Sequence, residues 1–334
     1  MSPLAHLSAA ALLQNYRFLL RRIAPARPIA VVKANAYGHG MRFVATTLFS
    51  AGCSDFAVAT AEEALALRAL LPRAEILVLG HTPHTQLSAL VAAGITPTAH
   101  DRESLAAITA HTDRYALKID TGMHRYGFPY DNLPLHISPR FVFSHLYAAD
   151  SAEIASAQIA RFFTAARRYP CADTHLCASA GLLRYGAAGA SHARAGLFLY
   201  GYGHPELTPV LTLSAQVIRT FTLRAGDSIG YGGAHRAARS ERIALINIGY
   251  ADGIPQNAAG GFMTLRGHPC EIVGRVSMDS CFLRLPRGLF PARGDRVTVY
   301  DRQGENIKSI AAASGRSIYE LLVHIGTRIP RQNE

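Results

Sequence analysis

The chain has 334 residues, of which 49% are apolar and 17% charged, a composition typical of a soluble globular protein with a sizeable core. Its net charge of +11 would suit a nucleic-acid binder, but the basic residues are spread along the chain and form no recognisable nucleic-acid module. No apolar run approaches the roughly 20 residues that cross a bilayer, and the first residues lack the features of a signal peptide. We expect a cytoplasmic protein without nucleic-acid or membrane partners.

Lysine is rare in this sequence. Only three of the 34 basic residues are lysines, Lys33, Lys118 and Lys308, and the other 31 are arginines. Arginine stays protonated, whereas a lysine can lose its proton and form a Schiff base, so the lysines are candidates for covalent chemistry. The five cysteines form no C-x-x-C pair, which indicates buried thiols and no metal site.

The first two-thirds of the chain alternates short apolar runs with helical stretches. A helix is predicted at Ser8–Ile23, and amphipathic helices follow at Ala61–Leu71 and Ala152–Arg168. The predicted strands are Pro28–Ala34, Asp55–Ala59, Glu75–Leu79, Ile95–Ala99, Arg114–Ile119, Arg140–Ser144, Thr174–Ala178 and Ala195–Tyr200. Strands this apolar are buried on both faces, and eight βα units predict a (β/α)8 TIM barrel over residues 8–210, with a doubly wound sheet as the alternative.

From Leu211 onward the pattern changes to alternating apolar and polar residues between turns rich in Gly, Asp and Arg. The runs are LTLSAQVIRTFTL, RIALINIGY, HPCEIVGRVSM and DRVTVYD. They predict a mostly antiparallel β domain over residues 211–334, which residues 1–7 could join. A final helix is predicted at Ser309–Ile325, although Gly315 inside it weakens a single unbroken helix.

Polar residues follow several of the predicted barrel strands. Lys33, Arg125, His145 and Ser179 stand at or after strand ends, and Arg194 stands at the start of the eighth predicted strand. Barrel enzymes build their active sites from the loops at the carboxyl ends of the strands. We therefore expect these five side chains to converge on one mouth of the barrel.

The segment VVKANAYGHG (31–40) resembles the cofactor-lysine motif of the alanine racemases, which are fold-type III enzymes dependent on pyridoxal 5'-phosphate (PLP). The resemblance covers nearly the whole chain, in order. It continues through LKIDTGMHRYGF (117–128), SHLYAAD (144–150), RAGLFLYG (194–201), IGYGG (229–233), IGYADGIP (248–255), GRVSMD (274–279) and YELLVHIGTRIPR (319–331). Eight motifs in sequence order make the resemblance specific.

The resemblance implies PLP-dependent racemisation of a small amino acid by two bases, which would supply D-alanine for cell-wall peptidoglycan. Lys33 would hold the cofactor as a Schiff base and then act as a base on one face of the substrate's α-carbon. Tyr250 would serve the opposite face, with His145 favouring its phenolate form. Arg194 would contact His145 and face the pyridine nitrogen of the cofactor, to which it donates without protonating it.

The remaining implied roles concern anions. Four residues would bind the cofactor phosphate: Tyr37, Ser179 and the backbone amides of Gly196 and Leu197. Arg125 would bind the substrate carboxylate in bidentate geometry. Lys118 matches a lysine that some family members carry as a carbamate, and an ordinary strand lysine is the alternative reading.

The family's active site lies between two subunits, so the resemblance also implies a homodimer with composite sites. Tyr250 and the segment around Met278 would come from the β domain of one subunit to the barrel of the other.

Departures from the family pattern include Ala178, in place of a common asparagine, and Thr327, which stands where some members have a phosphate-binding tyrosine. These differences leave the substrate less certain than the type of reaction. The alternatives are a serine racemase, a broad-specificity racemase, a basic amino-acid decarboxylase and a PLP-binding protein without turnover. A decarboxylase would not be expected to have the GYADG tyrosine, and the non-catalytic PLP-binding proteins lack a β domain.

Overall fold

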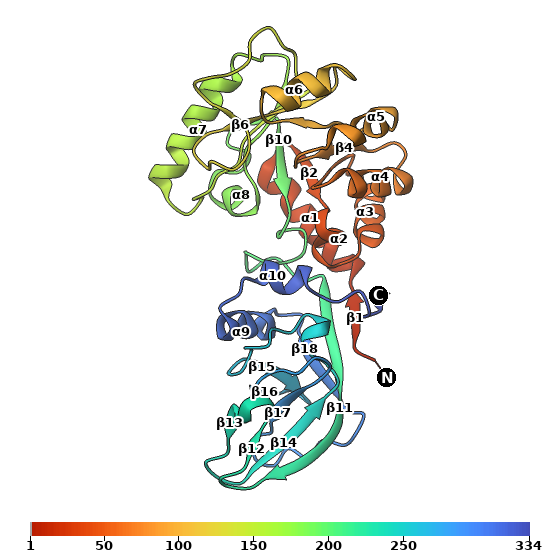
Figure 1. Ribbon diagram of the computed structural model, residues 1–334, viewed down its shortest axis with the longest axis vertical. Coiled ribbons are helices and arrows are strands. Elements are labelled where there is room, and N and C mark those ends of the chain that lie inside the picture. The colour runs from red at the N-terminus through yellow and green to blue at the C-terminus, as the bar shows by residue number, and fades with distance from the viewer. Residues whose placement is uncertain (1) are drawn as a thin grey trace. The chain divides into compact units, whose positions relative to one another are not determined.

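The computed structural model describes residues 2–334. They form two compact units, one of residues 12–207 and one that combines residues 2–11 with 208–334. Each unit contains one large β-sheet (Figure 1).

Eight parallel strands form a closed ring in the first unit. In order around the ring they are β2 (Arg27–Val31), β3 (Asp55–Val58), β4 (Glu75–Val78), β5 (Thr98–Ala99), β6 (Ala116–Asp120), β8 (Phe141–Phe143), β9 (Asp173–His175) and β10 (His192–Ala195). Strand β10 pairs with β2, and a parallel bridge from Leu77 to Thr96 closes the gap before β5. The predicted (β/α)8 barrel is confirmed.

Helices connect most of these strands and surround them (Figure 1). They are α1 (Ala9–Ile23), α2 (Lys33–Tyr37), α3 (Met41–Ser50), α4 (Ala61–Leu70), α5 (His84–Ala92), α6 (Arg102–Thr109), α7 (Ala152–Ala166) and α8 (Ser179–Tyr185). The connection from β6 to β8 differs, because residues 121–140 contain only the short strand β7 (Phe128–Pro129). A loop this long inside a compact domain is commonly functional.

Side chains of both kinds fill the barrel. An apolar cluster includes Ile29, Val31, Leu77, Phe141 and Phe143. The buried polar side chains on the strands include Lys118, His175, His192 and Arg194. Buried charged and imidazole groups are costly unless they are paired or functional, so they mark where the barrel carries chemistry.

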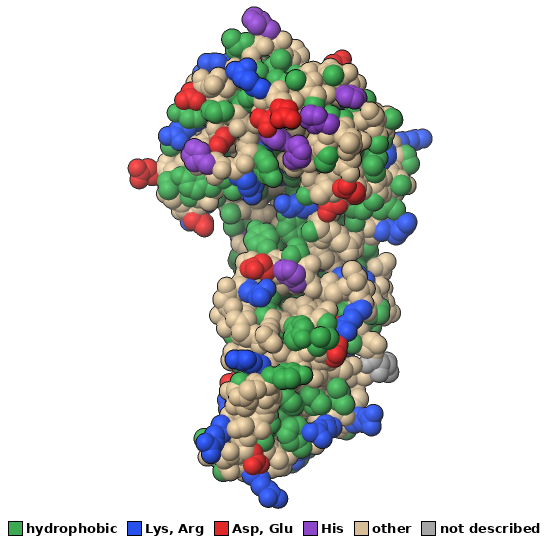
Figure 2. All heavy atoms as spheres, in the orientation of Figure 1, with side chains coloured by type: hydrophobic (Ala, Val, Ile, Leu, Met, Phe, Trp, Pro, Cys, Tyr) green, Lys and Arg blue, Asp and Glu red, His purple; other side chains and the backbone are tan. Residues whose placement is uncertain are grey.

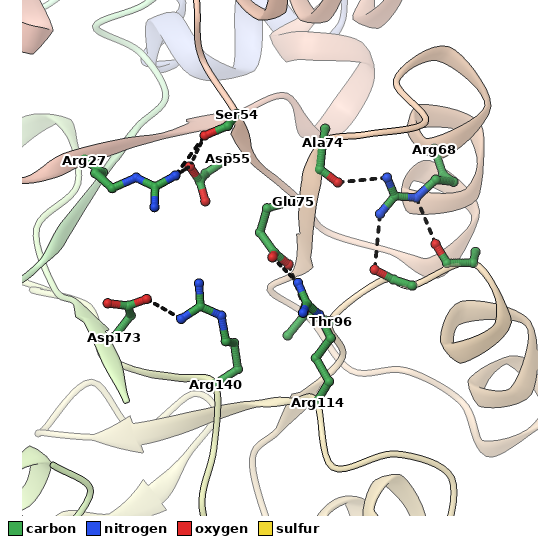
Figure 3. A network of polar contacts seen from close by, with 12 residues as sticks. Arg27, Ser54, Asp55, Arg68, Ala74, Glu75, Thr96, Arg114, Arg140 and Asp173 are labelled. Carbon is green, nitrogen blue, oxygen red and sulfur yellow. Dashed lines mark hydrogen bonds and ion pairs between the residues drawn. The ribbon is translucent and has the colours of Figure 1, made fainter. Parts of the chain in front are cut away.

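Three ion pairs close the amino ends of the strands (Figure 3). Arg27 Nη2 lies 2.8 Å from Asp55 Oδ2, Arg114 pairs with Glu75, and Arg140 pairs with Asp173. In the same view Arg68 donates to backbone carbonyls, among them that of Ala74 at 2.8 Å. This end of the barrel is built for stability.

The second unit is mostly antiparallel, as predicted. Six strands pair in a closed ring, in the order β14 (Glu241–Ile246), β17 (Cys281–Arg284), β16 (His268–Val273), β15 (Phe262–Leu265), β18 (Arg296–Tyr300) and β11 (Leu211–Leu223). Strand β1 (Leu4–Leu7) pairs with β11, and β19 (Arg331–Asn333) pairs with β1. The smaller elements are β12 (Ser228–Ile229), η1 (Tyr231–Gly233), β13 (His235–Arg236) and η2 (Tyr250–Asp252).

Three sequence predictions need correction. The eighth barrel strand is His192–Ala195, and the predicted strand at residues 195–200 is a buried turn. The apolar composition of this run reflects its burial and does not distinguish a turn from a strand. The final helix is two helices, α9 (Glu305–Ser314) and α10 (Ile318–Val323), since Gly315 adopts a left-handed φ of 66° and ends the first. Four cysteines are buried as expected, but Cys171 is exposed.

The surface agrees with the scattered distribution of charge in the sequence. On the face shown in Figure 2, Lys and Arg side chains lie among acidic and neutral ones and do not gather in one patch. Among residues 2–334, no helix has the length and apolar character needed to span a bilayer.

Candidate active site

Four predicted site residues meet at the carboxyl ends of the barrel strands. Lys33 follows β2, Lys118 lies in β6, His145 follows β8, and Arg194 lies in β10. The charges of Lys33, Lys118 and Arg194 all lower the pKa of His145, which requires that the four groups be close together. The predicted convergence therefore holds for Lys33, His145 and Arg194.

Lys33 begins an unusual left-handed turn. The four residues after it, Ala34 to Tyr37, all have φ between 51° and 54°, although none is glycine. Such a conformation costs roughly 1–2 kcal/mol per residue, so the surrounding structure must impose it. Glu63 contributes, because its Oε1 accepts from the Ala34 N–H at 2.6 Å and its Oε2 from the Ala59 N–H at 2.8 Å. The backbone beside Lys33 is thereby fixed by α4.

The environment of Lys33 favours its neutral amine. Burial lowers the pKa of Lys33, and the charges of Arg125 and Arg194 lower it further, while Glu63 opposes them. A lysine whose pKa is lowered in this way has more of the free amine at neutral pH, which is the form that attacks carbonyls and accepts protons.

Arg194 is 3% exposed and is held entirely by neutral acceptors. Its Nη2 donates to the carbonyls of Ser144 at 2.7 Å and Leu176 at 2.9 Å and to His145 Nδ1 at 3.1 Å. Its Nη1 donates to His175 Nδ1. Within the described chain its Nε makes no hydrogen bond, and burial lowers the pKa of Arg194 to about 10, which leaves it charged at neutral pH.

The contact with Arg194 fixes the tautomer of His145. A guanidinium only donates, so His145 Nδ1 must accept and its proton resides on Nε2. Burial, with the charge of Arg194 as the next cause, lowers the pKa of His145 to about 3. His145 is therefore a neutral imidazole that presents an N–H donor.

The predicted phosphate ligands surround the turn after β10. Ser179 Oγ accepts from the N–H groups of Gly196 and Phe198, both at 3.3 Å. The N–H of Leu197 makes no hydrogen bond within the described chain. A Cβ at Gly196 would lie 2.8 Å from Tyr37 Oη, so only glycine lets the tyrosine hydroxyl come this close. Hydroxyl and amide donors around a glycine turn suit a phosphate group.

Lys118 and Arg125 are near one another but not paired. Lys118 is 6% exposed, and burial together with Arg194 and Arg125 lowers its pKa to about 7. Its Nζ lies 5.4 Å from the ring centre of Phe143 and 5.7 Å from that of Tyr126. Arg125 projects from the 121–140 loop and makes no ion pair among the described residues. Both cations are therefore available to an anion.

In the second unit, Tyr250 and Met278 lie on adjoining segments and are 41% and 53% exposed. The Tyr250 N–H donates to Ser277 O at 3.0 Å, and a Cβ at Gly249 would lie 2.3 Å from Met278 O. The conformation of this turn is therefore tightly constrained.

A buried carboxylate anchors the same turn. Asp252 accepts from the Gly249 N–H at 2.9 Å and from Arg328 Nε at 2.7 Å, and Arg328 also reaches Asp279 at 2.7 Å. The IGYADGIP, GRVSMD and terminal motifs thus meet to hold Tyr250. A cavity of about 480 Å³ lies beside it, lined by residues that include Ile254, Gln256 and His324.

Sequence reasoning missed two residues of the barrel site. Glu63 could have been found from the T-x-x-E pattern of Thr60–Glu63, which marks a helix start and forms a capping box here. His175 had no local signal, because a single histidine in an apolar strand looks like any core residue.

A parallel barrel with cations at the carboxyl ends of its strands, continued by an antiparallel β unit, defines a two-domain barrel enzyme. The models of the alanine racemase N-terminal and C-terminal domains match residues 7–204 and 210–333. The chain is 37% identical to a catabolic alanine racemase from Rhizobium johnstonii, over 97% of this chain and 92% of that protein. It is 36% identical to an alanine racemase from Yersinia pestis, over 93% of each.

Solved structures agree. The biosynthetic alanine racemase from Pseudomonas aeruginosa is similar with a TM-score of 0.93 and 31% identity, covering all of both chains. The alanine racemase from Bartonella henselae with covalently bound pyridoxal phosphate is similar with a TM-score of 0.92 and 29% identity, again covering both chains fully. The chain belongs to the alanine racemase family, a family of isomerases, which confirms the expectation from its motifs.

Proposed function

We propose that this protein racemises alanine with PLP as cofactor, using Lys33 and Tyr250 as the two bases. The observation that carries the proposal is the barrel mouth, where Lys33, Lys118, Arg125 and Arg194 gather and none of the four forms an ion pair with a carboxylate of residues 2–334. Such a site suits a substrate carboxylate and a phosphorylated cofactor. Relatives named alanine racemase support alanine as the substrate.

The residues present fit PLP. Lys33 would hold it covalently, Arg194 would offer its remaining Nε donor to the ring nitrogen, and Tyr37, Ser179 and the Gly196–Leu197 amides would hold the phosphate. When bound, PLP withdraws electrons from the substrate's α-carbon and makes its hydrogen acidic. Arg194, which stays charged, stabilises the ring nitrogen without giving it a proton.

Lys33 and Tyr250 then move the proton. The lowered pKa of Lys33 increases the share of free amine that can take or return a proton on one face. A phenol with an ordinary pKa of about 10 is a poor base at neutral pH. We assign the neutral Nε2–H of His145 to donate to the Tyr250 oxygen and stabilise its phenolate form.

We further propose that the protein is a homodimer in which Tyr250 and Met278 come from the partner subunit. Their exposure on an otherwise rigid turn supports this, since a base must be shielded from water to work. Mixing Lys33→Ala and Tyr250→Phe chains tests it. Each mixed dimer would regain one intact site, so a one-to-one mixture should recover about a quarter of the wild-type activity. No recovery contradicts composite sites.

Lys118 is proposed to carry a carbamate that faces Arg125. With its pKa lowered to about 7, a large fraction of the amine is neutral at physiological pH. The nitrogen lone pair can then attack CO2, forming an N–C bond and releasing a proton. A ¹³C signal after incubation with labelled bicarbonate, present in the wild type and absent in Lys118→Met, would support this. Its absence in both would leave Lys118 an ordinary lysine.

The decisive assay uses the PLP-loaded protein with L-alanine or D-alanine in deuterated water. A racemase gives loss of optical activity and deuterium at the α-carbon from either enantiomer. A decarboxylase would release CO2, and a PLP-binding protein without turnover would give neither product. Tyr250→Phe should lower racemisation by roughly 10²–10⁴-fold while the cofactor's visible absorption persists. Unchanged racemisation in this variant would refute the two-base assignment.

The proposed role in the cell is to supply D-alanine for cell-wall peptidoglycan. Expression in a strain that cannot make D-alanine should restore growth without added D-alanine, and a Lys33→Ala variant should not. Serine or another small amino acid tested in the same assay would reveal a broader substrate range.

A further inference from the structure

Two imidazoles lie side by side in the centre of the barrel. His175 ends β9 and His192 begins β10, and these two residues are register partners in the parallel pair. Partners in register project to the same face of a sheet. Both rings also pack edge-on against Phe141, with centroid distances of 5.6 Å and 5.5 Å. His175 is 0% exposed and His192 1%, so both belong to the dry interior.

The protons of His175 are fixed by Arg194. Arg194 Nη1 donates to His175 Nδ1, which must therefore be an acceptor. Burial lowers the pKa of His175 well below the usual value, so the ring is neutral and its one proton is on Nε2. Among the described residues nothing accepts from that Nε2–H.

His192 has the complementary arrangement. Its Nδ1 lies 2.9 Å from Ser191 Oγ and 4.0 Å from Asp173 Oδ1, and the Ser191 hydroxyl donates to Thr174 O at 3.2 Å. The proton of His192 therefore belongs on Nδ1, facing these oxygens, and Nε2 carries a lone pair. Among the described residues nothing donates to that Nε2 either.

His175 Nε2–H is a buried donor and His192 Nε2 is a buried acceptor, and neither has a hydrogen-bond partner among the described residues. Because the two residues are paired in register, one molecule could satisfy both atoms. We propose that one buried water joins His175 Nε2–H to His192 Nε2 and so completes a chain of hydrogen bonds from Ser191 to Arg194. Buried waters commonly bridge polar groups in this way. The chain begins at Ser191, which precedes β10 at the amino end of the barrel, and ends at Arg194 on the proposed cofactor side.

The chain makes His192 a positioning residue for Arg194. Arg194 has no carboxylate partner, so its orientation depends on neutral acceptors, of which His175 Nδ1 is one. If His175 lost the acceptor for its Nε2–H, it could shift the proton to Nδ1, where it would oppose the Arg194 donor. The effect of this orientation on catalysis rests on the proposed function, whereas the hydrogen-bond chain does not depend on it.

The test compares His192→Phe with His192→Gln in the holoenzyme. Phenylalanine keeps an aromatic ring against Phe141 but removes the acceptor, and glutamine keeps an acceptor for the water and a donor for Ser191 Oγ. A high-resolution crystal structure reads the water directly. Nitrogen NMR of ¹⁵N-histidine protein reads the tautomers, independently of activity.

We expect water density within hydrogen-bond distance of both Nε2 atoms in the wild type, with His175 protonated on Nε2 and His192 on Nδ1. His192→Phe should lose the water, shift the His175 signals and lower kcat/KM roughly tenfold, the effect of one buried hydrogen bond. His192→Gln should restore most of each readout.

Absence of the water, the opposite His192 tautomer, or His175 signals unchanged in His192→Phe would each overturn the chain. If the chain is present but the wild type does not racemise alanine, the proposed function fails alone.

Discussion

At the amino ends of the barrel strands, arginines pair with carboxylates, whereas at the carboxyl ends the cations have no such partner. Arg27 and Arg140 each contact an acidic side chain of the adjacent strand, and Arg114 contacts Glu75 of β4. At the other end Lys33, Lys118, Arg125 and Arg194 make no ion pair within the described chain. The same ring of strands thus carries balanced charge at one end and excess positive charge at the other.

The difference shows how a barrel separates stability from function. Paired charges at the amino ends need nothing further, because each has its counterion within the fold. At the carboxyl ends, burial and then the charges of Arg125 and Arg194 lower the pKa values of Lys33 and Lys118. These cations gain counterions only when an anion binds, so the excess of positive charge marks the site.

The largest effect is expected from a substitution that keeps the positive charge of Lys33 but removes its ability to form a Schiff base. Lys33→Arg retains a cation at the barrel mouth, but arginine neither forms a Schiff base nor gives up a proton at neutral pH. We expect racemase activity to fall by at least roughly 10⁴-fold, with loss of the visible absorption of bound PLP.

Lys308→Arg is the matched control for this change. Lys308 is a surface lysine that pairs with Glu305 at 2.8 Å in the second unit. Its substitution should leave activity and absorption unchanged. Racemisation that survives in Lys33→Arg would move the catalytic amine elsewhere.

Arg125→Lys asks whether the unpaired loop cation recognises the substrate carboxylate. Lysine keeps the charge but cannot make two parallel hydrogen bonds, so KM for alanine should rise about 10–100-fold with a smaller change in kcat. Steady-state kinetics with Arg102→Lys, an exposed arginine of α6, as control would measure this. An unchanged KM would remove Arg125 from substrate binding.

Lys118→Met tests the cost of an unpaired buried cation. The folded pKa of Lys118, about 7, lies below its unfolded value of 10.5. The unfolded chain therefore binds more protons between these values, and the penalty for burying Lys118 is complete below pH 7 and vanishes above pH 10.5. Without cofactor or bicarbonate, Lys118→Met should raise the melting temperature most at pH 7 and progressively less toward pH 10. A gain independent of pH would contradict the lowered pKa.

Much of this contrast could be predicted from the sequence. Apolar runs of strand length, alternating with helices, indicated the barrel, and the polar residues after those runs indicated its functional end. The motifs also suggested roles for Lys33, Arg194 and Tyr250, which stay predictions. Burial was predictable because it follows from composition. The strand at residues 195–200 was not, because a buried turn and a buried strand have the same apolar pattern.

Features that depend on contacts between residues far apart in the chain could not be predicted from the sequence. Nothing in Ala34–Tyr37 marks a left-handed turn, because Glu63 and the barrel impose it. His175 and His192 are separated by 16 residues and become neighbours only through the pairing of β9 with β10. Strands β15 and β17 are four residues each, too short for alternation to stand out from the surrounding turns.

The smallest effect is expected at the amino end. Arg114 is 45% exposed and pairs with Glu75, which also accepts from Thr96 at 2.9 Å, so Arg114→Gln leaves the carboxylate with a partner. Partly exposed ion pairs contribute about 0–1 kcal/mol, so thermal unfolding should shift by only a few degrees and less at high salt. Because Arg114 lies outside the proposed hydrogen-bond chain from Ser191 to Arg194, kcat/KM should not change. A loss of activity without a loss of stability would mean that the two ends of the barrel are coupled. It would contradict the division into a stabilising amino end and a functional carboxyl end.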